Sequence, residues 1–582
     1  MPMGRRRHKQ GSDARQGLRS SAERVCRWGA ALALCATLAA PAVAAATPAV
    51  TAARHAKGRS HTHRHHAPAA PLERTAVDPA GPGQIHVGGA AAVAQASYPA
   101  GVERLHYRYG PLLVAPGTNL ILVGNKPMPK PEESGYVVGL VPNLTYPDGK
   151  VPPTDVLHLH HGVWLSTAGS DVTTPGLPYQ RFFATGEEKT QLHLPAPYGY
   201  PVGANDKWLL NYMIHNLTER SYTVYITYEV DFVPLQSPLG QTIRPVRPVW
   251  MDVRNGEAYP VFNTLRGSGS GGTYTYPDQD PSAYSASTQL DEWTVDRPGT
   301  LVWAAGHLHP GGLYDTLEMT RSGAQVAPAS GQPPPLAGAQ PGSVRLFRST
   351  AHYWDPRGPI SWDLAMGVTA PDWRVAVKPG DTLRVSTTYD SRRASWYEGM
   401  GIMVLWMAED ETGVNPFTHP VDQSEEITHE RLPENVDAGA AMSLHLPDAR
   451  RLPNGHAPHN TIDIKEFAYD YGGFGLPGNA GDPPTVTAGH SLTFINLDNR
   501  KQIFHTITSC QAPCVLSGGI SYPLANGPIG FDSAQLGTGL AGFTAASNRI
   551  TWKTPANLPP GTYTYFCRIH PFMRGSFRVV RG

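Results

Sequence analysis

Cysteine is scarce in this 582-residue sequence, which contains only five. Cys26 and Cys35 lie in the N-terminal segment, so three cysteines remain for the rest of the chain. Cys510 and Cys514 are close enough in sequence to form a tight disulfide, which would leave Cys567 without a cysteine partner. A lone thiol in an oxidising compartment invites oxidation unless something occupies it.

An excess of charge of either sign is also missing. The 48 Lys and Arg residues nearly balance the 47 Asp and Glu residues, and the formal net charge is +1. The net charge therefore creates no overall electrostatic field that would favour a nucleic-acid or membrane partner. Beyond the N-terminal segment, no apolar run is long enough to span a membrane.

The N-terminal segment itself has the pattern of an export signal. Basic residues precede an Ala-rich apolar run over residues 28–44, which ends in the small-x-small motif of Ala42, Val43 and Ala44. We predict a signal peptide over residues 1–45 and a secreted or extracytoplasmic mature chain, with an uncleaved anchor as the alternative. Residues 46–83 indicate a disordered Ala/Pro/His-rich linker, whose histidines between positions 61 and 66 could instead scavenge divalent metal weakly.

Helical periodicity is hard to find in this sequence. The 60 glycines and 56 prolines favour many turns and short strands. In residues 222–232 the even positions are Tyr, Val, Ile, Tyr, Val and Phe, and the odd positions are mostly polar. Further strands are expected over residues 121–123, 136–141, 208–214, 301–305, 313–319, 382–389 and 401–407. We predict an all-β protein with β domains at 84–235, 236–412 and 455–582, and a linker at 413–454.

The last part of the chain brings a thiolate, an imidazole and a thioether together. Cys567, His570 and Met573 lie within seven positions, between two strand-like runs, and His505 lies on an earlier predicted strand. Trigonal His2Cys with a long axial Met is the ligand set of blue-copper electron-transfer sites. The region resembles the plastocyanin-like cupredoxin family. That resemblance implies a Greek-key β-sandwich over residues 455–582 and one type 1 copper ion bound by these four residues.

Histidines in the middle of the chain form a second pattern. On a strand, residues i and i+2 face the same side, which pairs His158 with His160 and His307 with His309. The order of motifs resembles the copper type II monooxygenases, the peptidylglycine α-hydroxylating and dopamine β-hydroxylating family. That resemblance implies two jelly-roll-like domains and two type 2 copper ions. The implied ligands are His160, His161 and His215 for the first ion, and His307, His309 and Met400 for the second.

The middle region also departs from that family. Residues 100–410 contain no cysteine, although the family's domains carry several disulfides. Ala305 stands where the peptide hydroxylases have an arginine, and Val404 does not clearly match their downstream aromatic residue. Adjacent His160 and His161 reach one ion only if the strand bulges or ends there, and otherwise His158 and His160 are the better pair.

Three functions follow as alternatives. The first is one-electron transfer by the C-terminal copper, with a redox partner protein or small reductant. The second is a copper-dependent monooxygenase that uses O2 and a small organic substrate, with the C-terminal domain feeding electrons to the type 2 ions. The third is non-redox copper storage or delivery. Multicopper oxidase and copper nitrite reductase patterns need a histidine beside the type 1 cysteine, and Cys567 is flanked by Phe566 and Arg568.

Overall fold

The computed structural model describes residues 100–582, with gaps inside that range. The gaps are residues 125, 155, 219, 257–259, 281–290, 322–330, 332–341, 355–358, 360, 393, 433–446, 475–480, 502, 511–529, 539–548 and 571. The predicted signal peptide, the histidines of the N-terminal linker and Cys514 lie outside the described residues. Cys510 is disulfide-bonded. Among the described residues, no helix is long and apolar enough to cross a membrane.

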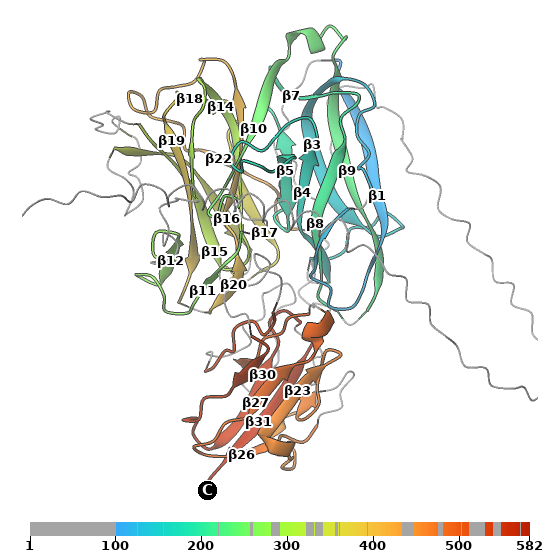
Figure 1. The fold of residues 1–582 in the computed structure, drawn as a ribbon, viewed down its shortest axis with the longest axis vertical. Helices are drawn as coiled ribbons and strands as arrows, with labels where there is room; N and C mark the ends of the chain where they lie inside the picture. Colours follow the sequence, from blue (N-terminus) through green and yellow to red (C-terminus); the bar gives the residue numbers. More distant parts are fainter. Residues whose placement is uncertain are drawn as a thin grey trace, which may run out of the picture. The chain divides into compact units, whose positions relative to one another are not determined.

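The predicted all-β fold class is confirmed, and the regular structure consists of β-strands and a few single-turn 3-10 helices (Figure 1). The largest sheet has sixteen strands, ordered β1-β9-β3-β7-β10-β21-β14-β17-β16-β15-β19-β12, with β6, β13, β18 and β22 attached beside this path. Its strands are β1 (Glu103–Val114), β3 (Gly135–Thr145), β6 (Leu192–His193), β7 (Tyr198–Val202), β9 (Tyr222–Pro234), β10 (Arg244–Asp252), β12 (Thr273–Tyr276), β13 (Glu292–Thr294), β14 (Gly299–His307), β15 (Gly312–Thr320), β16 (Ser343–Tyr353), β17 (Leu364–Thr369), β18 (Val375–Val377), β19 (Thr382–Asp390), β21 (Ile402–Ala408) and β22 (Glu425–Ile427).

Four smaller sheets complete the strand inventory of the described ranges. A four-stranded sheet contains β2 (Ile121–Val123), β8 (Trp208–Asn216), β4 (Leu157–Ser166) and β5 (Gln180–Gly186), in that order, and β11 (Phe262–Thr264) pairs with β20 (Trp396–Gly399). The C-terminal region has two sheets. One contains β24 (Ala468–Tyr469), β23 (Thr461–Lys465), β27 (Thr493–Asn496) and β29 (Thr551–Lys553), and the other contains β25 (Gly473–Phe474), β31 (Arg574–Val580), β30 (Gly561–Phe566), β28 (Thr508–Cys510) and β26 (Thr485–Thr487). The 3-10 helices are η1 (Gly240–Thr242), η2 (Ala449–Arg451), η3 (Pro458–Asn460) and η4 (Asp498–Lys501).

Alternating apolar residues explain why β9 occupies the middle of its sheet. From Val224 to Phe232 every even-numbered side chain is buried, as the period of two predicts. β9 pairs antiparallel with β1 on one side and with β3 on the other, and Figure 1 shows β1 and β9 side by side. The buried face of this sheet and the β2-β8-β4-β5 sheet enclose one hydrophobic core that includes Trp164 and Trp208.

Sheet pairing continues between the first two predicted β domains. β7 pairs in parallel with β10, and β10 pairs antiparallel with β21. A second core, which includes Trp373 and Trp396, lies among β14, β15, β17, β19 and β21. Within the segment predicted as a linker, β22 pairs with β17. The described residues from 100 to 582 belong to one compact unit.

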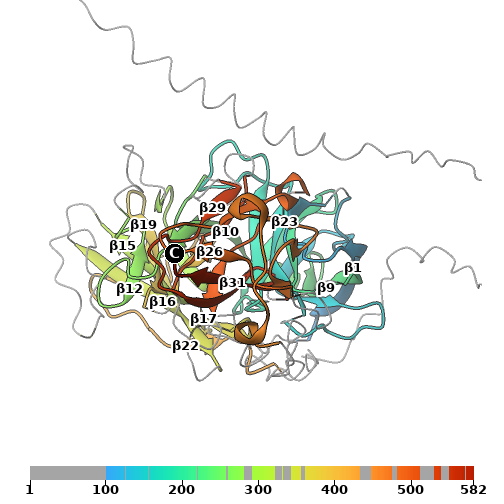
Figure 2. The ribbon, with the colours of Figure 1, turned by 90° about the horizontal axis from the view of Figure 1, so that it is seen from below.

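The C-terminal region packs its two sheets around a third core. Apolar side chains from both sheets, including Phe494, Tyr565 and Phe577, form this core together with Cys567 and Met573. β26 pairs in parallel with β31, and both views show these strands side by side (Figures 1 and 2). The core therefore extends directly to the loop between β30 and β31, where three of the predicted ligands lie.

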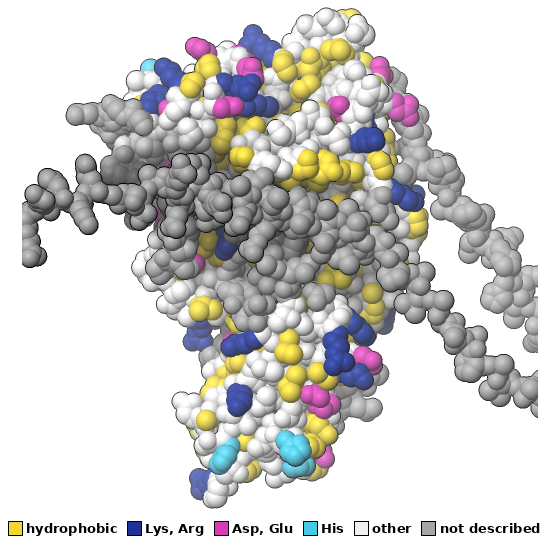
Figure 3. Space-filling view, in the orientation of Figure 1, with side chains coloured by type: hydrophobic (Ala, Val, Ile, Leu, Met, Phe, Trp, Pro, Cys, Tyr) yellow, Lys and Arg dark blue, Asp and Glu magenta, His cyan; other side chains and the backbone are white. Residues whose placement is uncertain are grey.

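The visible surface carries charged side chains of both signs. Figure 3 shows Lys and Arg interspersed with Asp and Glu over the face that it presents, without a field of one sign. This pattern agrees with the net charge of +1.

Candidate metal centres

The C-terminal cluster joins side chains from two loops of neighbouring strands. Cys567 follows directly after β30, His570 lies in the same loop, and His505 precedes β28, which pairs with β30. All three residues are fully buried. The sulfur of Cys567 lies 3.7 Å from Nδ1 of His505 and 3.7 Å from Nδ1 of His570, and the two Nδ1 atoms are 3.1 Å apart. The structure thus brings three predicted ligands to one point.

These separations fit a shared metal ion. With a metal–nitrogen bond of about 2.0 Å and a metal–sulfur bond of about 2.3 Å, a trigonal site places its nitrogens about 3.5 Å apart and its sulfur about 3.7 Å from each. The observed triangle is close to that geometry. Met573 is buried, and its backbone N–H donates to the carbonyl of His570. One thiolate and two imidazoles form a ligand set that suits copper.

The atoms behind these ligands hold them in place. Nε2 of His505 donates to Oδ2 of Asp498 at 3.0 Å, and Nε2 of His570 lies 2.9 Å from the carbonyl oxygen of Gly117. Backbone N–H groups of Thr506 and His570 point at the Cys567 sulfur at 3.3 and 3.4 Å. Both imidazoles therefore present Nδ1 toward the sulfur, because their outer nitrogens are engaged elsewhere.

Two pKa shifts show that this environment favours the ionised forms of Cys567 and Asp498. Burial alone would raise the pKa of the Cys567 thiol, but hydrogen bonds and charge interactions with His505 and His570 hold that pKa well below its usual value. Burial would also raise the pKa of Asp498, but hydrogen bonds from His505 and from the backbone of Phe467 and Glu466 lower it to about 2. A thiolate is the form of cysteine that binds metals.

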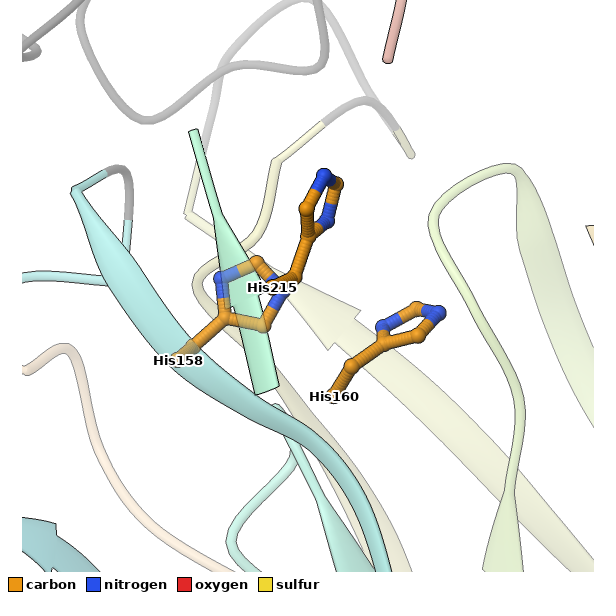
Figure 4. A group of neighbouring side chains, drawn as sticks. All are labelled: His158, His160 and His215. Atoms are coloured by element: carbon orange, nitrogen blue, oxygen red, sulfur yellow. The ribbon is translucent and has the colours of Figure 1, made fainter. Parts of the chain in front are cut away.

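A second cluster lies on β4 and β8. β4 pairs with β8 so that His158 faces His215 across the ladder, and one ligand atom from each of His158, His160 and His215 lies within 4.8 Å of the others. Figure 4 shows His158 and His160 on the same side of β4, with His215 on the neighbouring strand. The β4–β8 register shifts between Leu159 and His161, so a β-bulge falls at His160.

Carboxylates after β5 bind further histidines of this cluster. Glu187 lies between two imidazoles, because its carboxylate oxygens are 2.7 Å from Nδ1 of His309 and 3.2 Å from Nδ1 of His160. Oε2 of Glu188 accepts from Nδ1 of His307 at 2.9 Å. The rings of His160 and His309 stack with their centroids 4.0 Å apart. These contacts join the first and second predicted histidine sets into one cluster.

The grouping differs from the ligand sets implied by the monooxygenase resemblance. His158, not His161, lies with His160 and His215, while the His161 ring lies 5.4 Å from that of His160 and 6.4 Å from that of His309. His309 groups with His160 and Glu187. Met400 is buried, and its backbone N–H and carbonyl both bond to the Tyr389 hydroxyl. His158 and His160 face the same side of β4 despite the bulge, as alternation along a strand predicts, and the β4–β8 register sets His215 opposite His158.

The residues that surround the ligands were not predicted from the sequence. Glu187 and Glu188 directly follow β5, which was not predicted, and nothing in the pattern of residues 180–190 distinguishes them from solvated charges. Trp362 contacts the rings of His158, His160 and His215, with centroid distances of 4.7, 5.8 and 5.4 Å. The carbonyls of Thr154 and Ile569, which bond His158 and His215, carry no sequence signal at all.

The two clusters meet through the loop after β30. Nε2 of His215 lies 3.3 Å from the carbonyl oxygen of Ile569, the residue before His570. Arg568, in the same loop, binds Asp532 and lies over the rings of Trp396 and Tyr397. The described residues thus define an all-β protein with two adjoining clusters of buried metal-ligand side chains.

Comparisons with known proteins add little to this description. No family model matches the sequence, and no curated protein matches it. Among solved structures, the chain is similar to the Cu-containing nitrite reductase (NirK) from Thermus scotoductus SA-01, at 13% sequence identity and a TM-score of 0.13. The match covers 50% of this chain and 59% of that one.

Proposed function

We propose that the C-terminal region binds one copper ion through His505, Cys567 and His570, with Met573 as a weak axial ligand, and transfers single electrons. The observation that carries this proposal is the triangle formed by the Cys567 sulfur and the two Nδ1 atoms, with sides of 3.7, 3.7 and 3.1 Å. A copper ion bound there supplies one-electron redox chemistry.

The surroundings support a redox role rather than a labile store. The ligands are buried, and their outer nitrogens are fixed by Asp498 and by the Gly117 carbonyl, so they have little freedom to move when the charge of the ion changes. Apolar side chains, among them Ile569 and Phe572, keep water from the sulfur. A site with fixed ligands needs little reorganisation to give up or accept an electron.

The test is spectroscopic. The purified copper-loaded chain should show a blue absorption band, which requires a Cys–Cu(II) bond, and an electron paramagnetic resonance signal with small hyperfine splitting. Cys567→Ser and His505→Gln should abolish both signals. His490→Gln, which changes an exposed histidine, is the matched control and should leave them intact. A colourless protein that releases copper readily would replace this proposal with copper storage or delivery.

We also propose, as a second function, a copper-dependent monooxygenase that uses O2 and a small organic substrate. The observation that favours it is the histidine cluster, which lies one hydrogen bond from the C-terminal loop. The chain's own residues would position the ions and exclude water, and an external reductant would supply electrons. Reductant-dependent O2 consumption that His160→Gln abolishes would support this function, and its absence with a range of small C–H substrates would count against it.

We also propose that the chain is exported from the cytoplasm. The pattern of residues 1–45 supports cleavage of a signal peptide and a mature chain outside the cytoplasm. N-terminal sequencing of the protein recovered from its native host tests this, since it should begin near Ala45.

A further inference from the structure

We propose that His158, His160 and His215 bind a second copper ion, and that this ion receives its electron from the Cys567 cluster through the hydrogen bond between the Ile569 carbonyl and His215. This inference rests on the proposed electron-transfer function. It adds a metal site, its ligand atoms and its route of reduction.

The orientation of the imidazoles identifies the ligand atoms. His158 uses Nδ1 to bond the carbonyl of Thr154 at 2.6 Å, and His215 uses Nε2 to bond the carbonyl of Ile569 at 3.3 Å. Within the part of the chain that the structure describes, Nε2 of His158 and Nδ1 of His215 are buried and have no hydrogen-bond partner. A metal-ligating histidine typically donates its other N–H to a carbonyl or carboxylate, as both residues do here.

The third ligand lies beside a carboxylate. Oε2 of Glu187 lies 3.2 Å from Nδ1 of His160, on the ring edge away from Nε2, at ion-pair distance but without hydrogen-bond geometry. With ligand atoms of all three residues within 4.8 Å of one another, a single ion can reach them all. The set is therefore three imidazoles with two carbonyls and one carboxylate behind them.

A purely structural role does not account for this arrangement. Buried polar atoms nearly always have partners, because leaving one unpaired costs about 1–3 kcal/mol. Here the unpaired nitrogens of His158 and His215 lie in the same small cluster. Imidazole nitrogens that converge without other partners can bind a metal ion.

The surroundings favour a redox ion over a structural one. Trp362 packs against all three rings and shields them. Imidazole nitrogens accept zinc, nickel and copper, and copper binds most tightly in that series. The contact of His215 with the loop that carries Cys567 and His570 gives a redox ion at this position a direct connection to an electron donor.

The route consists of covalent bonds and one hydrogen bond. From the His570 ring it follows the main chain to the Ile569 carbonyl, and from there it crosses 3.3 Å to the His215 ring. One electron from an external reductant enters at the Cys567 cluster. That electron then leaves the Cys567 cluster, which is oxidised, and enters the three-histidine site, which is reduced, with no change in bonding.

Copper content and electron paramagnetic resonance test the site. The full chain loaded with copper should contain about two equivalents, one with the narrow splitting of a thiolate site and one with the wide splitting of an imidazole site. His158→Gln should reduce the content to about one equivalent and remove only the wide signal. His352→Gln is the matched control, because His352 pairs with Glu425 at a half-exposed position, and it should change neither signal.

Outcomes for the two proposals can be told apart. A blue protein with a single copper equivalent, or with zinc at the second position after copper loading, overturns the three-histidine copper site and leaves the proposed function standing. A protein that shows only the wide signal, lost in His158→Gln, overturns the proposed function and the electron route while keeping the second site.

Rapid one-electron reduction tests the route. After a reducing pulse bleaches the blue band, the wild-type band should recover in a first-order phase as the wide signal decreases. In His158→Gln, which retains His215 and its contact with Ile569, that phase should slow at least tenfold. Recovery at the wild-type rate in His158→Gln would overturn the route.

Discussion

The C-terminal cluster and the histidine cluster differ in how their ligands are distributed along the chain. Cys567, His570 and Met573 occupy one loop, and only His505 comes from elsewhere. The histidine cluster takes side chains from β4, β8, the turn after β5 and the end of β14. The first is defined by the sequence of one loop, whereas the second exists only because separate sheets pack against each other.

The carboxylates behind the ligands differ in the same way. Asp498 accepts from one ligand, His505, and from two backbone N–H groups nearby. Glu187 contacts two histidines from different sheets, His160 and His309. Substitution of Asp498 should therefore affect one ligand histidine, whereas substitution of Glu187 should affect histidines from two sheets.

The largest expected effect is a loss of stability when the buried ion pair next to the histidine cluster is broken. Asp171 accepts a bidentate contact from Arg181 on β5, whose neighbour β4 carries the histidines. Removing one partner of such a buried pair costs about 3 kcal/mol or more, so Asp171→Asn should lower the stability markedly at pH 7. Thermal unfolding measures this, and Asp148→Asn, at an exposed position, is the control. Equal melting temperatures for Asp171→Asn and wild type would refute the expectation.

The pH dependence of the two ion pairs should have opposite signs. Burial would raise the pKa of Asp171, but hydrogen bonds from Arg181 and Thr173 lower it below its ordinary value of 3.8. Its stabilisation is present above that value and is lost as pH falls through the lower, folded-state pKa. Burial raises the pKa of Asp532 despite Arg568, so its contribution should decline as pH rises from 3.8 through the folded-state pKa. Unfolding of each Asn variant between pH 3 and pH 7 checks both signs.

Glu187→Gln tests whether the histidine cluster depends on the shared carboxylate. Loss of a partner behind a ligand typically reduces metal affinity by about 10- to 100-fold. Here the ligand His160 and the neighbouring His309 both lose a charged partner. We expect this loss at the histidine site alone, with the blue band unchanged. Glu425→Gln removes a carboxylate from the half-exposed His352 and should change neither site. Competition with a chelator measures the affinities, and equal affinities for the Glu187→Gln and Glu425→Gln variants would contradict the role of Glu187.

Asp498→Asn is the corresponding change in the C-terminal cluster. Only one imidazole, that of His505, loses a charged partner, and the single Asn oxygen can still accept from one of the two backbone N–H groups, that of Glu466 or that of Phe467. We expect about a 10-fold loss of copper affinity, at the small end of the range for such partners. A loss larger than that of Glu187→Gln would reverse the comparison between the clusters.

The smallest effect is expected at Gly117. Its φ is +60°, and a Cβ there would lie 2.2 Å from the Phe467 ring and 3.0 Å from His570. A left-handed alanine costs about 1–2 kcal/mol, and the ring must also move. Gly117→Ala should lower the melting temperature slightly and shift the blue band, because the Gly117 carbonyl bonds His570. Gly149→Ala, with φ +86° and open space around it, controls for backbone strain alone and should leave the band unchanged.

Much of the fold could be predicted from the sequence. The alternation in residues 222–232 predicted β9, and the predicted strand over 121–123 matches β2. Local periodicity carries that information because it needs no knowledge of partners. The pairing of β7 with β10 and of β22 with β17 could not be predicted, since it depends on which distant edges meet.

In the clusters too, contacts within one short motif could be predicted from the sequence and contacts between distant segments could not. The proximity of Cys567, His570 and His505 was expected because the motif is compact. Alternation along a strand predicted His158 and His160 as one possible pair. Their grouping with His215 follows from the β4–β8 register, which depends on which strands meet and has no local sequence pattern. Glu187 and the Ile569 carbonyl are placed by packing between sheets, which one sequence does not encode in any local signal.

The contact between His570 and Gly117 has a consequence for how electrons could be exchanged. The outer nitrogen of this imidazole is engaged by a carbonyl of the same polypeptide, so a visiting protein cannot approach along that edge. In the proposed transfer, the Cys567 site and the three-histidine site belong to one chain, so their distance is fixed by the fold rather than by diffusion. Diluting the protein should therefore leave the rate of internal transfer per molecule unchanged.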